Sequence, residues 1–273
     1  MEVLVTGGTG VVGRQVVERL HARGTAVRVL SRRSSFQLPD GVRTFRGDLR
    51  SGAGLSEALA GADVVVHCAS ATGNPLYRPA RRTDVDGTRR LLEAARQRGT
   101  PHLVYISIVG VDRVPLGYYR AKLETEQVIE NSHLPYTILR TTQFHDLILR
   151  VLQTSPAPLL IIPAGFRFQP IHSAEVAERL VELTRSSPAG HVADMGGPQV
   201  RGIEDLARAY LVSTRRTRVI VRLPLPGRAA AAFRAGHHLC PERVVGTVSW
   251  ENFLTQHLDS SSRNKTTRRP RHE

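Results

Sequence analysis

The sequence predicts an α/β protein built on a doubly wound parallel sheet with a small C-terminal lobe. Two observations lead to this fold class. Short apolar runs alternate with amphipathic helical patterns in the first half of the chain, and a spaced set of glycines follows the first run. Apolar strands separated by helices are typical of a parallel sheet that is buried on both faces. With 273 residues, of which 41% are hydrophobic, the chain can bury a large core.

Each expected element follows from its residue pattern. Strands are expected where apolar residues run together, and helices where apolar residues recur every three or four positions. The expected strands are 3–5, 26–30, 42–45, 64–68, 102–106 and 136–140. The expected helices are 12–23, 55–59, 88–98, 118–131, 173–185, 203–212 and 228–235. Proline becomes frequent after residue 150, where the alternation loosens and the lobe is expected to begin.

Composition narrows the class of protein and the compartment. The two cysteines, Cys68 and Cys240, do not provide a disulfide framework, so a reducing compartment, the cytoplasm, is expected. No segment approaches the roughly 18 apolar residues of a membrane span, so no membrane association is expected. The net charge of +14 could indicate a nucleic-acid partner. Because the arginines are spread over most helices and no nucleic-acid-binding motif is present, we do not expect one.

A glycine-rich turn lies between the first strand and the first helix. Gly7, Gly10 and Gly13 are three residues apart in the segment VLVTGGTGVVGRQVV. Glycine permits a tight turn and a close approach of the backbone to a pyrophosphate, while the following helix directs its amino terminus at the phosphates. The turn therefore predicts a dinucleotide site formed by these glycines with Thr9 and Val12.

The end of the second strand indicates which dinucleotide is bound. A carboxylate there would hold the ribose 2′-hydroxyl of NAD(H) and repel a 2′-phosphate. This chain has Ser31, Arg32 and Arg33 instead, and arginine is well suited to binding a phosphate. NADP(H) is therefore the expected cofactor, with NAD(H) as the alternative.

Further motifs follow in the order seen in one large family. GDL, with Asp48 and Leu49, follows the third strand; HCAS, with Ala69 and Ser70, ends the fourth; DVDGTRRLLEAA comes next. Over residues 1–185 the chain resembles the extended and atypical short-chain dehydrogenases/reductases, and most of all their NmrA-like, NAD(P)H-binding group. The resemblance implies that Asp48 and Leu49 lie beside the adenine and that Ala69 and Ser70 lie along the cofactor. Asp84 stands where extended members usually have asparagine.

The segment GYYRAKLETE predicts an acid/base pair on a helix. Tyr118 and Lys122 are four residues apart, so they share one helical face. In the reductases that the chain resembles, such a tyrosine transfers the substrate proton, and the lysine holds the nicotinamide ribose and lowers the tyrosine pKa. The resemblance implies catalytic roles for both residues here. Tyr119 is three residues from the lysine and remains an alternative.

Lysine is rare in this chain. Of the 38 lysines and arginines, only Lys122 and Lys265 are lysines, and Lys265 falls in a predicted tail. Arginine does not titrate in proteins, whereas the charge of lysine is tunable, so the one lysine expected in the folded part indicates chemistry. Glu124, Glu126 and Glu130 are expected on the solvated face of the same helix.

One part of the family pattern is missing. A serine or threonine that polarises the carbonyl is expected one or two residues after Ser107, but Ile108 and Val109 occupy these positions. This departure weakens the case for sugar epimerisation and for ordinary carbonyl reduction. It leaves hydride transfer to an activated acceptor such as a quinone or enone, for which Lys122 without a second hydroxyl is expected to suffice, or no chemistry at all.

Two more groups of residues could bind a ligand, one a substrate and the other a metal ion. Phe144 and His145 follow the sixth strand, where the chain should cross the substrate side of the sheet, so both are predicted to contact substrate. The segment HHLC at residues 237–240 lacks the companion pair of a tetrahedral metal site, so no metal is expected.

The predicted function is NADPH-dependent reduction of a small hydrophobic carbonyl, quinone or enone. The alternative is a non-catalytic, NmrA-like dinucleotide sensor, and the third reading is an NAD-dependent epimerase or dehydratase. The predicted domains are an NAD(P)-binding domain at 1–150, a substrate lobe interleaved with it at 151–258 and a disordered basic tail at 259–273. The helices at 88–98 and 121–131 resemble the dimer seam of the family, which implies a homodimer.

Overall fold

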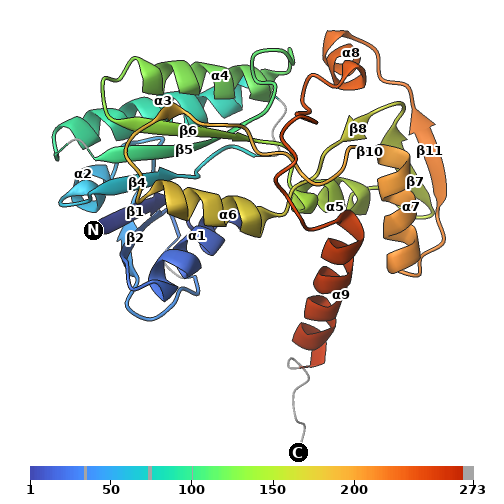
Figure 1. Cartoon of the computed structure of the whole chain (residues 1–273), viewed down its shortest axis with the longest axis horizontal. Helices are drawn as coiled ribbons and strands as arrows, with labels where there is room; N and C mark the ends of the chain where they lie inside the picture. The colour runs from blue at the N-terminus through green and yellow to red at the C-terminus, as the bar shows by residue number, and fades with distance from the viewer. Residues whose placement is uncertain (34–35, 73–75, 100, 267–273) are drawn as a thin grey trace, which may run out of the picture. The chain divides into compact units, whose positions relative to one another are not determined.

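The computed structural model describes residues 1–33, 36–72, 76–99 and 101–266, which form two compact units (Figure 1). Unit 1 contains Met1–Thr141 and Ser173–Met195; unit 2 contains Thr142–His172 and the described residues from Gly196 onward. The first division therefore falls at residue 141 and not at the predicted residue 150, and residues 173–195 return to unit 1. The reason is that a helix and a short strand of this returning segment pack on the sheet of unit 1.

Unit 1 is a seven-stranded parallel sheet with helices on both faces. Its elements are β1 (Glu2–Thr6), α1 (Val11–Ala22), β2 (Ala26–Ser31), β3 (Arg43–Arg46), α2 (Leu55–Leu59), β4 (Val64–His67), α3 (Tyr77–Arg96), β5 (His102–Ile108), α4 (Gly117–Glu130), β6 (Tyr136–Thr141), α6 (Ser173–Leu183) and β9 (Gly190–His191). Helices α3 and α4 pack together on one face, and α1 and α6 pack together on the other (Figure 1). The predicted doubly wound α/β fold class is confirmed.

The main core of unit 1 is formed by aliphatic side chains of the sheet and of α2, α3 and α4. Leu4, Leu59, Leu91 and Ile138 are fully buried in it. The strands β1 and β4 contribute uninterrupted apolar runs because both faces of the sheet are covered.

The strand order places one point of the sheet at the centre of the fold. The order is β3-β2-β1-β4-β5-β6-β9, so the chain runs from β3 at one edge back to β4 on the other side of β1. The carboxyl ends of β1 and β4 therefore flank a topological switch point. Ligands of open α/β sheets bind at such points.

A hydrogen-bonded chain of side chains ties α3 to the switch point. His67 of β4 contacts Thr6 of β1 through Nδ1, at 2.6 Å, and Thr88 of α3 through Nε2, at 2.9 Å. Thr88 Oγ1 donates its own proton to the carbonyl of Asp84. The Nε2–H of His67 must therefore donate to Thr88, and Nδ1 accepts from Thr6. Burial lowers the pKa of His67 to about 3, which keeps the ring neutral.

Helix α3 begins at Tyr77, well before the predicted start at residue 88. Its first turns are polar and contain Pro79, and this pattern is typical of a loop. Proline is tolerated in a first turn because the N–H groups there have no acceptor within the helix. Ala80, Asp84 and Thr88 recur every four residues on the buried face of this extension.

Glu126 of α4 is buried, in contrast to the predicted solvated position. Its carboxylate accepts two hydrogen bonds from the guanidinium of Arg140 in β6, at 3.0 Å from Nε and 2.5 Å from Nη2. A buried carboxylate requires such a partner, and a two-pronged arginine pair supplies both charge and geometry. Helical periodicity alone cannot show the partner, because it lies on a neighbouring strand.

Unit 2 consists of helices and two small sheets around an aromatic-rich core. Its elements are α5 (His145–Gln153), β7 (Leu159–Pro163), β8 (Arg167–Phe168), β10 (Arg201–Gly202), α7 (Ile203–Ser213), β11 (Val219–Leu223), α8 (Arg228–Ala235) and α9 (Trp250–Thr266). Strands β7 and β11 pair in parallel, and β8 and β10 pair antiparallel. Leu160, Leu206, Trp250 and Phe253 lie in the core.

Helix α9 continues through Thr266, so residues 259–266 are helical where the sequence predicts disorder. Lys265 consequently belongs to a helix. The first turns of α9 are held by the buried side chains of Trp250, Phe253 and Leu254. Adding a residue to an existing helix is much easier than starting one, so a polar segment can extend an anchored helix. The other tail residues, 267–273, lie outside the described residues.

Two buried histidines make the stability of unit 2 dependent on pH. Burial lowers the pKa of His145 to about 3 and that of His238 to about 4. The unfolded chain binds these protons first as the pH falls, because its histidines titrate near pH ~6.5. The stability contributed by the neutral rings is therefore present above pH ~6.5 and is lost as the pH falls toward about 4 to 3. Each histidine should contribute a slope of about 1.4 kcal/mol per pH unit.

Urea unfolding of the full chain, followed by the fluorescence of its single tryptophan, Trp250, measures this slope. Since carboxylates add to the slope, the matched comparison is His145→Phe, which keeps an aromatic ring in the same stack. The variant should lose about 1.4 kcal/mol per pH unit of the acid dependence. Equal slopes for the two proteins would contradict the assignment.

Candidate active site

The glycine turn between β1 and α1 leaves no room for a side chain at two positions. Gly7 has a φ of +71°, and a Cβ there would lie 2.6 Å from the backbone nitrogen of Ala69. A Cβ on Gly13 would lie 2.3 Å from the carbonyl oxygen of Gly7. The turn is therefore in contact with the end of β4, and the first turn of α1 packs directly on the end of β1.

The amino terminus of α1 is suited to an anion. Gly10 is the N-cap residue and makes no side-chain hydrogen bond to the helix, and the first turn contains no acidic residue. Such a terminus offers backbone N–H groups and the positive end of the helix dipole. Thr9 is half-buried beside it, and Val12 is buried. The predicted loop residues thus fit the pyrophosphate of a dinucleotide.

The end of β2 carries cationic side chains in place of a carboxylate. Ser31 is buried, and its Oγ accepts a hydrogen bond from the backbone N–H of Arg33 at 3.0 Å. Arg32 and Arg33 are both exposed. This arrangement offers a 2′-phosphate two guanidinium groups.

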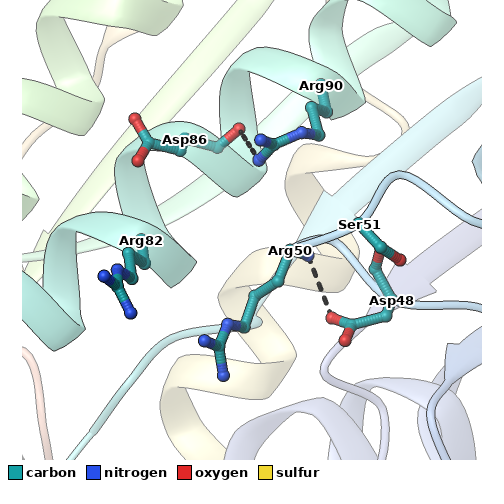
Figure 2. A pocket seen from close by; sticks show the side chains of 6 residues that line it. All are labelled: Asp48, Arg50, Ser51, Arg82, Asp86 and Arg90. Carbon is teal, nitrogen blue, oxygen red and sulfur yellow. Dashed lines mark hydrogen bonds between the residues drawn. The ribbon is translucent and has the colours of Figure 1, made fainter.

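Asp48 and Leu49 lie in the turn after β3. Asp48 lines a pocket, shown in Figure 2, together with Arg50 and Ser51 of the same turn and with Arg82, Asp86 and Arg90 of α3. The Asp48 carboxylate accepts a hydrogen bond from the backbone N–H of Arg50 at 2.9 Å. Leu49 is buried and packs against Gly87 of α3, where a Cβ would lie 3.1 Å from the leucine Cβ. The turn after β3 is thereby held against α3.

Ser70, which follows β4, connects α3 with α4. Its Oγ donates a hydrogen bond to Oδ1 of Asp84 at 2.5 Å, and it lies 2.9 Å from the hydroxyl oxygen of Tyr118. The other oxygen of Asp84 accepts from the backbone N–H of Ala71 at 2.9 Å. The structure therefore brings Ser70 and Tyr118, both predicted site residues, into direct contact around a carboxylate that the sequence analysis gave no role.

Tyr118 has a higher pKa than a free tyrosine, which is the opposite of the expected effect of Lys122. Burial, and after it the negative charge of Asp84, raise the pKa of Tyr118 to about 12, against hydrogen bonds from Ser70 and Thr72 that lower it. The neighbouring Tyr119 is buried, and its ring meets that of Tyr118 edge-on at 6.4 Å. Of the two tyrosines, Tyr118 has its hydroxyl at the end of β4, beside Ser70.

Lys122 is a buried cation held by β5. Its Nζ donates to the carbonyl oxygen of Ile106 at 2.7 Å and lies 4.1 Å from the ring centre of Tyr105. Burial lowers the pKa of Lys122, and the negative charges of Asp84 and Glu126 oppose this shift. The ammonium has three protons, so one donor to Ile106 leaves two for other acceptors.

The hydroxyl of Ser107 on β5 is buried and has no hydrogen-bond partner among the described residues. A buried hydroxyl without a partner costs free energy and is uncommon in folded proteins outside functional sites. Ile108 and Val109, which follow it, supply no second hydroxyl. Of the hydroxyl groups that the family pattern places in this segment, the chain retains that of Ser107.

Phe144 and His145, predicted to contact substrate, belong to unit 2. Phe144 precedes α5 and is half-buried. His145 is buried in an aromatic stack, with ring centres 5.7 Å from Trp250 and 5.0 Å from Phe253. The aromatic stack gives His145 a structural role, and its contact with substrate stays a prediction.

Two further observations concern ligands and membranes. In the described part of the chain, no group of three or more histidine, cysteine, aspartate or glutamate side chains is placed to hold a metal ion. Within the segment 237–240, His238 donates through Nε2 to the carbonyl of Arg167 at 2.7 Å, and Cys240 is buried. Among the same described residues, no helix is long and apolar enough to span a membrane.

The parallel sheet, its switch point and the glycine turn define an α/β protein of the Rossmann type that is suited to a dinucleotide. A family model described as NAD(P)H-binding matches residues 7–186, more than half of the chain, and the protein belongs to this family. The expected membership of an NAD(P)H-binding family is thereby confirmed.

Curated relatives match parts of the chain. The photosystem II assembly factor Ycf39 of Trieres chinensis is 30% identical over 152 residues, which are 54% of this chain and 47% of the relative. The human decarboxylating sterol-4-alpha-carboxylate 3-dehydrogenase is 37% identical over 111 residues, which are 39% of this chain and 29% of the relative. The matched parts thus span about half, or less, of the length of these relatives.

Solved structures share the fold at low sequence identity. A UDP-glucose 4-epimerase of Thermotoga maritima has a TM-score of 0.77 and 18% identity, with 97% of this chain and 100% of the other covered. An NADPH-dependent quinone oxidoreductase of Escherichia coli, solved with NADPH, has a TM-score of 0.74 and 17% identity, with 94% and 99% covered. These likenesses establish the fold alone.

Replacing Gly13 by alanine should abolish dinucleotide binding. The added Cβ would lie 2.3 Å from the Gly7 carbonyl oxygen, so the turn must shift away from the position that presents its N–H groups. We expect an affinity loss of about 100-fold or more, corresponding to roughly 3 kcal/mol, measured by calorimetric titration with NADPH.

Gly10→Ala is the matched variant, since its Cβ would lie 3.2 Å from the same oxygen and needs only a small adjustment. It should bind NADPH far better than Gly13→Ala. Thermal unfolding of both variants separates loss of the site from loss of the fold. Unchanged affinity in a folded Gly13→Ala protein would show that the cofactor binds elsewhere.

Proposed function

We propose that the protein binds NADPH and reduces a small hydrophobic carbonyl, quinone or enone. The observation that carries this proposal is the position of Tyr118 and Lys122 on one side of α4. Their polar atoms meet Ser70, after β4, and Ile106, in β5, at 2.9 Å and 2.7 Å. Because strands β1, β4 and β5 are parallel, this is the edge of the sheet that also carries the glycine turn.

The reductive direction is supported by the names of two proteins with this fold or sequence. One is the quinone oxidoreductase of Escherichia coli, whose likeness is one of fold. The other is a divinyl chlorophyllide a 8-vinyl-reductase of Cucumis sativus, 31% identical over 163 residues, which are 52% of this chain and 38% of the relative. The first name combines NADPH with a quinone, and the second is that of a reductase of a vinyl group.

Each predicted site residue has a place in this proposal. The turn that contains Gly7, Thr9, Gly10, Val12 and Gly13 holds the pyrophosphate. Ser31, Arg32 and Arg33 hold the 2′-phosphate, Asp48 and Leu49 lie beside the adenine, and Ala69 and Ser70 lie along the cofactor. When bound, NADPH supplies a hydride. Lys122 holds the nicotinamide ribose with its remaining donors, and Tyr118 gives a proton to the substrate oxygen; Phe144 and His145 are proposed substrate contacts.

The cofactor preference depends on the two arginines after β2. Replacing both Arg32 and Arg33 by alanine should weaken NADPH binding about tenfold to 100-fold, because charge-assisted hydrogen bonds to a phosphate are worth ~1.5–3 kcal/mol. NADH binding should stay unchanged, since NADH has no 2′-phosphate. Calorimetric titration with both nucleotides measures the two effects.

Arg98→Ala is the control for a general loss of positive charge, because Arg98 is exposed and donates through Nε to Ser56, away from the end of β2. It should leave both affinities as in the wild type. A wild type that prefers NADH, or an equal loss for both nucleotides in the double variant, would contradict the preference.

The second candidate function is a dinucleotide sensor that regulates a partner protein. It is favoured by the absence of a second hydroxyl after Ser107 and by the pKa of Tyr118, raised to about 12, which opposes release of the phenol proton to a substrate. A third candidate, a nucleotide-sugar epimerase or dehydratase, is supported by fold alone. The cytoplasmic location and the homodimer stay predictions.

Turnover of a panel of quinones and enones with NADPH distinguishes enzyme from sensor. The wild type should oxidise NADPH with at least one panel member, and Tyr118→Phe should reduce kcat by about 100-fold to 10,000-fold, the usual contribution of a general acid. Lys122→Met, which keeps the aliphatic stem but not the charge, should lose both activity and nicotinamide affinity. Stopped-flow absorbance of NADPH follows each reaction.

Tyr119→Phe is the matched control, because it removes the neighbouring hydroxyl from the same turn of α4. It should retain wild-type turnover. Loss of activity in Tyr119→Phe with retention in Tyr118→Phe would reverse the assignment. Tight NADPH binding without turnover of any panel member would favour the sensor.

A further inference from the structure

A chain of three side chains leads away from the Tyr118 hydroxyl into the protein. The hydroxyl lies 2.9 Å from Ser70 Oγ, and Ser70 Oγ lies 2.5 Å from Oδ1 of Asp84. Oδ2 of Asp84 accepts from the backbone N–H of Ala71 at 2.9 Å, which fixes the plane of the carboxylate. Asp84 itself is only 1% exposed.

The protonation state of Asp84 sets the direction of every hydrogen bond in this chain. An ionised carboxylate only accepts, so Ser70 must donate its single proton to Asp84. Ser70 can then only accept from Tyr118, whose proton points toward the serine and away from any substrate. A protonated Asp84 instead donates to Ser70, Ser70 donates to the phenol oxygen, and the Tyr118 proton is turned away from the serine.

The surroundings of Asp84 allow both protonation states. Burial raises the pKa of Asp84, and the positive charge of Lys122 is the largest effect that opposes this shift. The titratable groups that interact with it are Lys122 and Tyr118 on α4 and Tyr105 on β5. Glu126 and Cys68 in turn act on Lys122, and Lys122 acts on His67. Burial thus favours the protonated carboxyl group of Asp84, whereas the positive charge of Lys122 favours the carboxylate.

We propose that Asp84 stores the proton of the reductive reaction and delivers it to Tyr118 through Ser70. This inference rests on the proposed function. Asp84 does not touch the reacting atoms, so it is a positioning residue that acts through Ser70 and Tyr118. Because it works only in its protonated form, it also makes reduction dependent on pH.

The proton transfers balance in a single reductive turnover. The hydride from NADPH forms the new C–H bond of the substrate, and the O–H bond of Tyr118 breaks as its proton passes to the substrate oxygen. The Ser70 proton then passes to the Tyr118 oxygen, and the Asp84 proton passes to Ser70. The products are the reduced substrate, NADP⁺ and an Asp84 carboxylate, which regains a proton from solvent before the next cycle.

The first arm of the test needs neither cofactor nor substrate. Asp84→Asn keeps the shape of the side chain; its amide oxygen can accept from Ala71 N–H and its NH₂ group can donate to Ser70. Burial is the largest cause of the raised pKa of Tyr118, and the negative charge of Asp84 is the second. The variant removes this charge and turns Ser70 into a donor to the phenol oxygen. Tyr118 should therefore ionise at lower pH, as followed by NMR of ring-labelled tyrosine with Tyr118→Phe for assignment.

Asp86→Asn is the matched control for this arm. Asp86 lies on the same helix and pairs with Arg81 and Arg89 at the surface. It should leave the Tyr118 titration unchanged. An unaltered Tyr118 titration in Asp84→Asn would overturn the proposal, whatever the activity of the protein.

The second arm is the pH dependence of kcat/KM. In the wild type, turnover should fall by roughly tenfold per pH unit once Asp84 ionises, as expected for one essential acid. Asp84→Asn should lack this decline, and Asp86→Asn should keep it. Identical pH profiles for wild type and Asp84→Asn would overturn the relay and leave the reductase function intact. Absence of any turnover in a wild type that binds NADPH would overturn the proposed function, and the relay with it.

Discussion

The burial of the Lys122 ammonium is the constraint on which the arrangement of the site depends. A cation removed from water is stable only when carbonyl dipoles, aromatic faces or carboxylates replace its hydration. Lys122 has all of these: the Ile106 carbonyl at 2.7 Å, the Tyr105 ring at 4.1 Å, and the negative charges of Asp84 and Glu126. The pairing fixes α4 against β5, and through Asp84 it fixes α3 against α4.

The two carboxylates near Lys122 have different partners and therefore different roles. Glu126 is fully engaged by the guanidinium of Arg140, so its charge is neutralised at short range. Among the hydrogen bonds of the described residues, Asp84 accepts from two neutral donors, Ser70 Oγ and Ala71 N–H, and its charge acts on Tyr118 and Lys122. Glu126 and Arg140 thus form a structural ion pair, whereas the protonation state of Asp84 can change. This difference is why Asp84, and not Glu126, is assigned the proton transfer in our proposal.

Features encoded in adjacent residues could be predicted from the sequence, and features made by distant residues could not. The glycine turn is a local signal, because the spacing of Gly7, Gly10 and Gly13 is itself the geometry that places a strand end against a helix start. Likewise, the pairing of Tyr118 with Lys122 on one face follows from helical periodicity. The buried ion pair of Glu126 with Arg140 crosses from α4 to β6, and periodicity gives no information about it.

The polar first turns of α3 illustrate the same limit. Their helical state depends on packing of Ala80, Asp84 and Thr88 against elements far along the chain. In unit 2, the ring of His145 stacks with Trp250 and Phe253, which lie about a hundred residues later in the chain. The local pattern around His145 gives no information about these contacts.

In our proposal, the direction of the Tyr118 proton distinguishes a reductase from a sensor. Both functions require the glycine turn and the arginines after β2, so cofactor binding cannot separate them. With Asp84 ionised, Ser70 donates to Asp84 and the Tyr118 proton is directed at Ser70, which is the arrangement expected of the proposed sensor. With Asp84 protonated, the proposed relay can pass a proton from Asp84 through Ser70 to Tyr118. A raised pKa of Asp84 therefore favours chemistry, and an asparagine at this position would orient Tyr118 permanently but would store no proton.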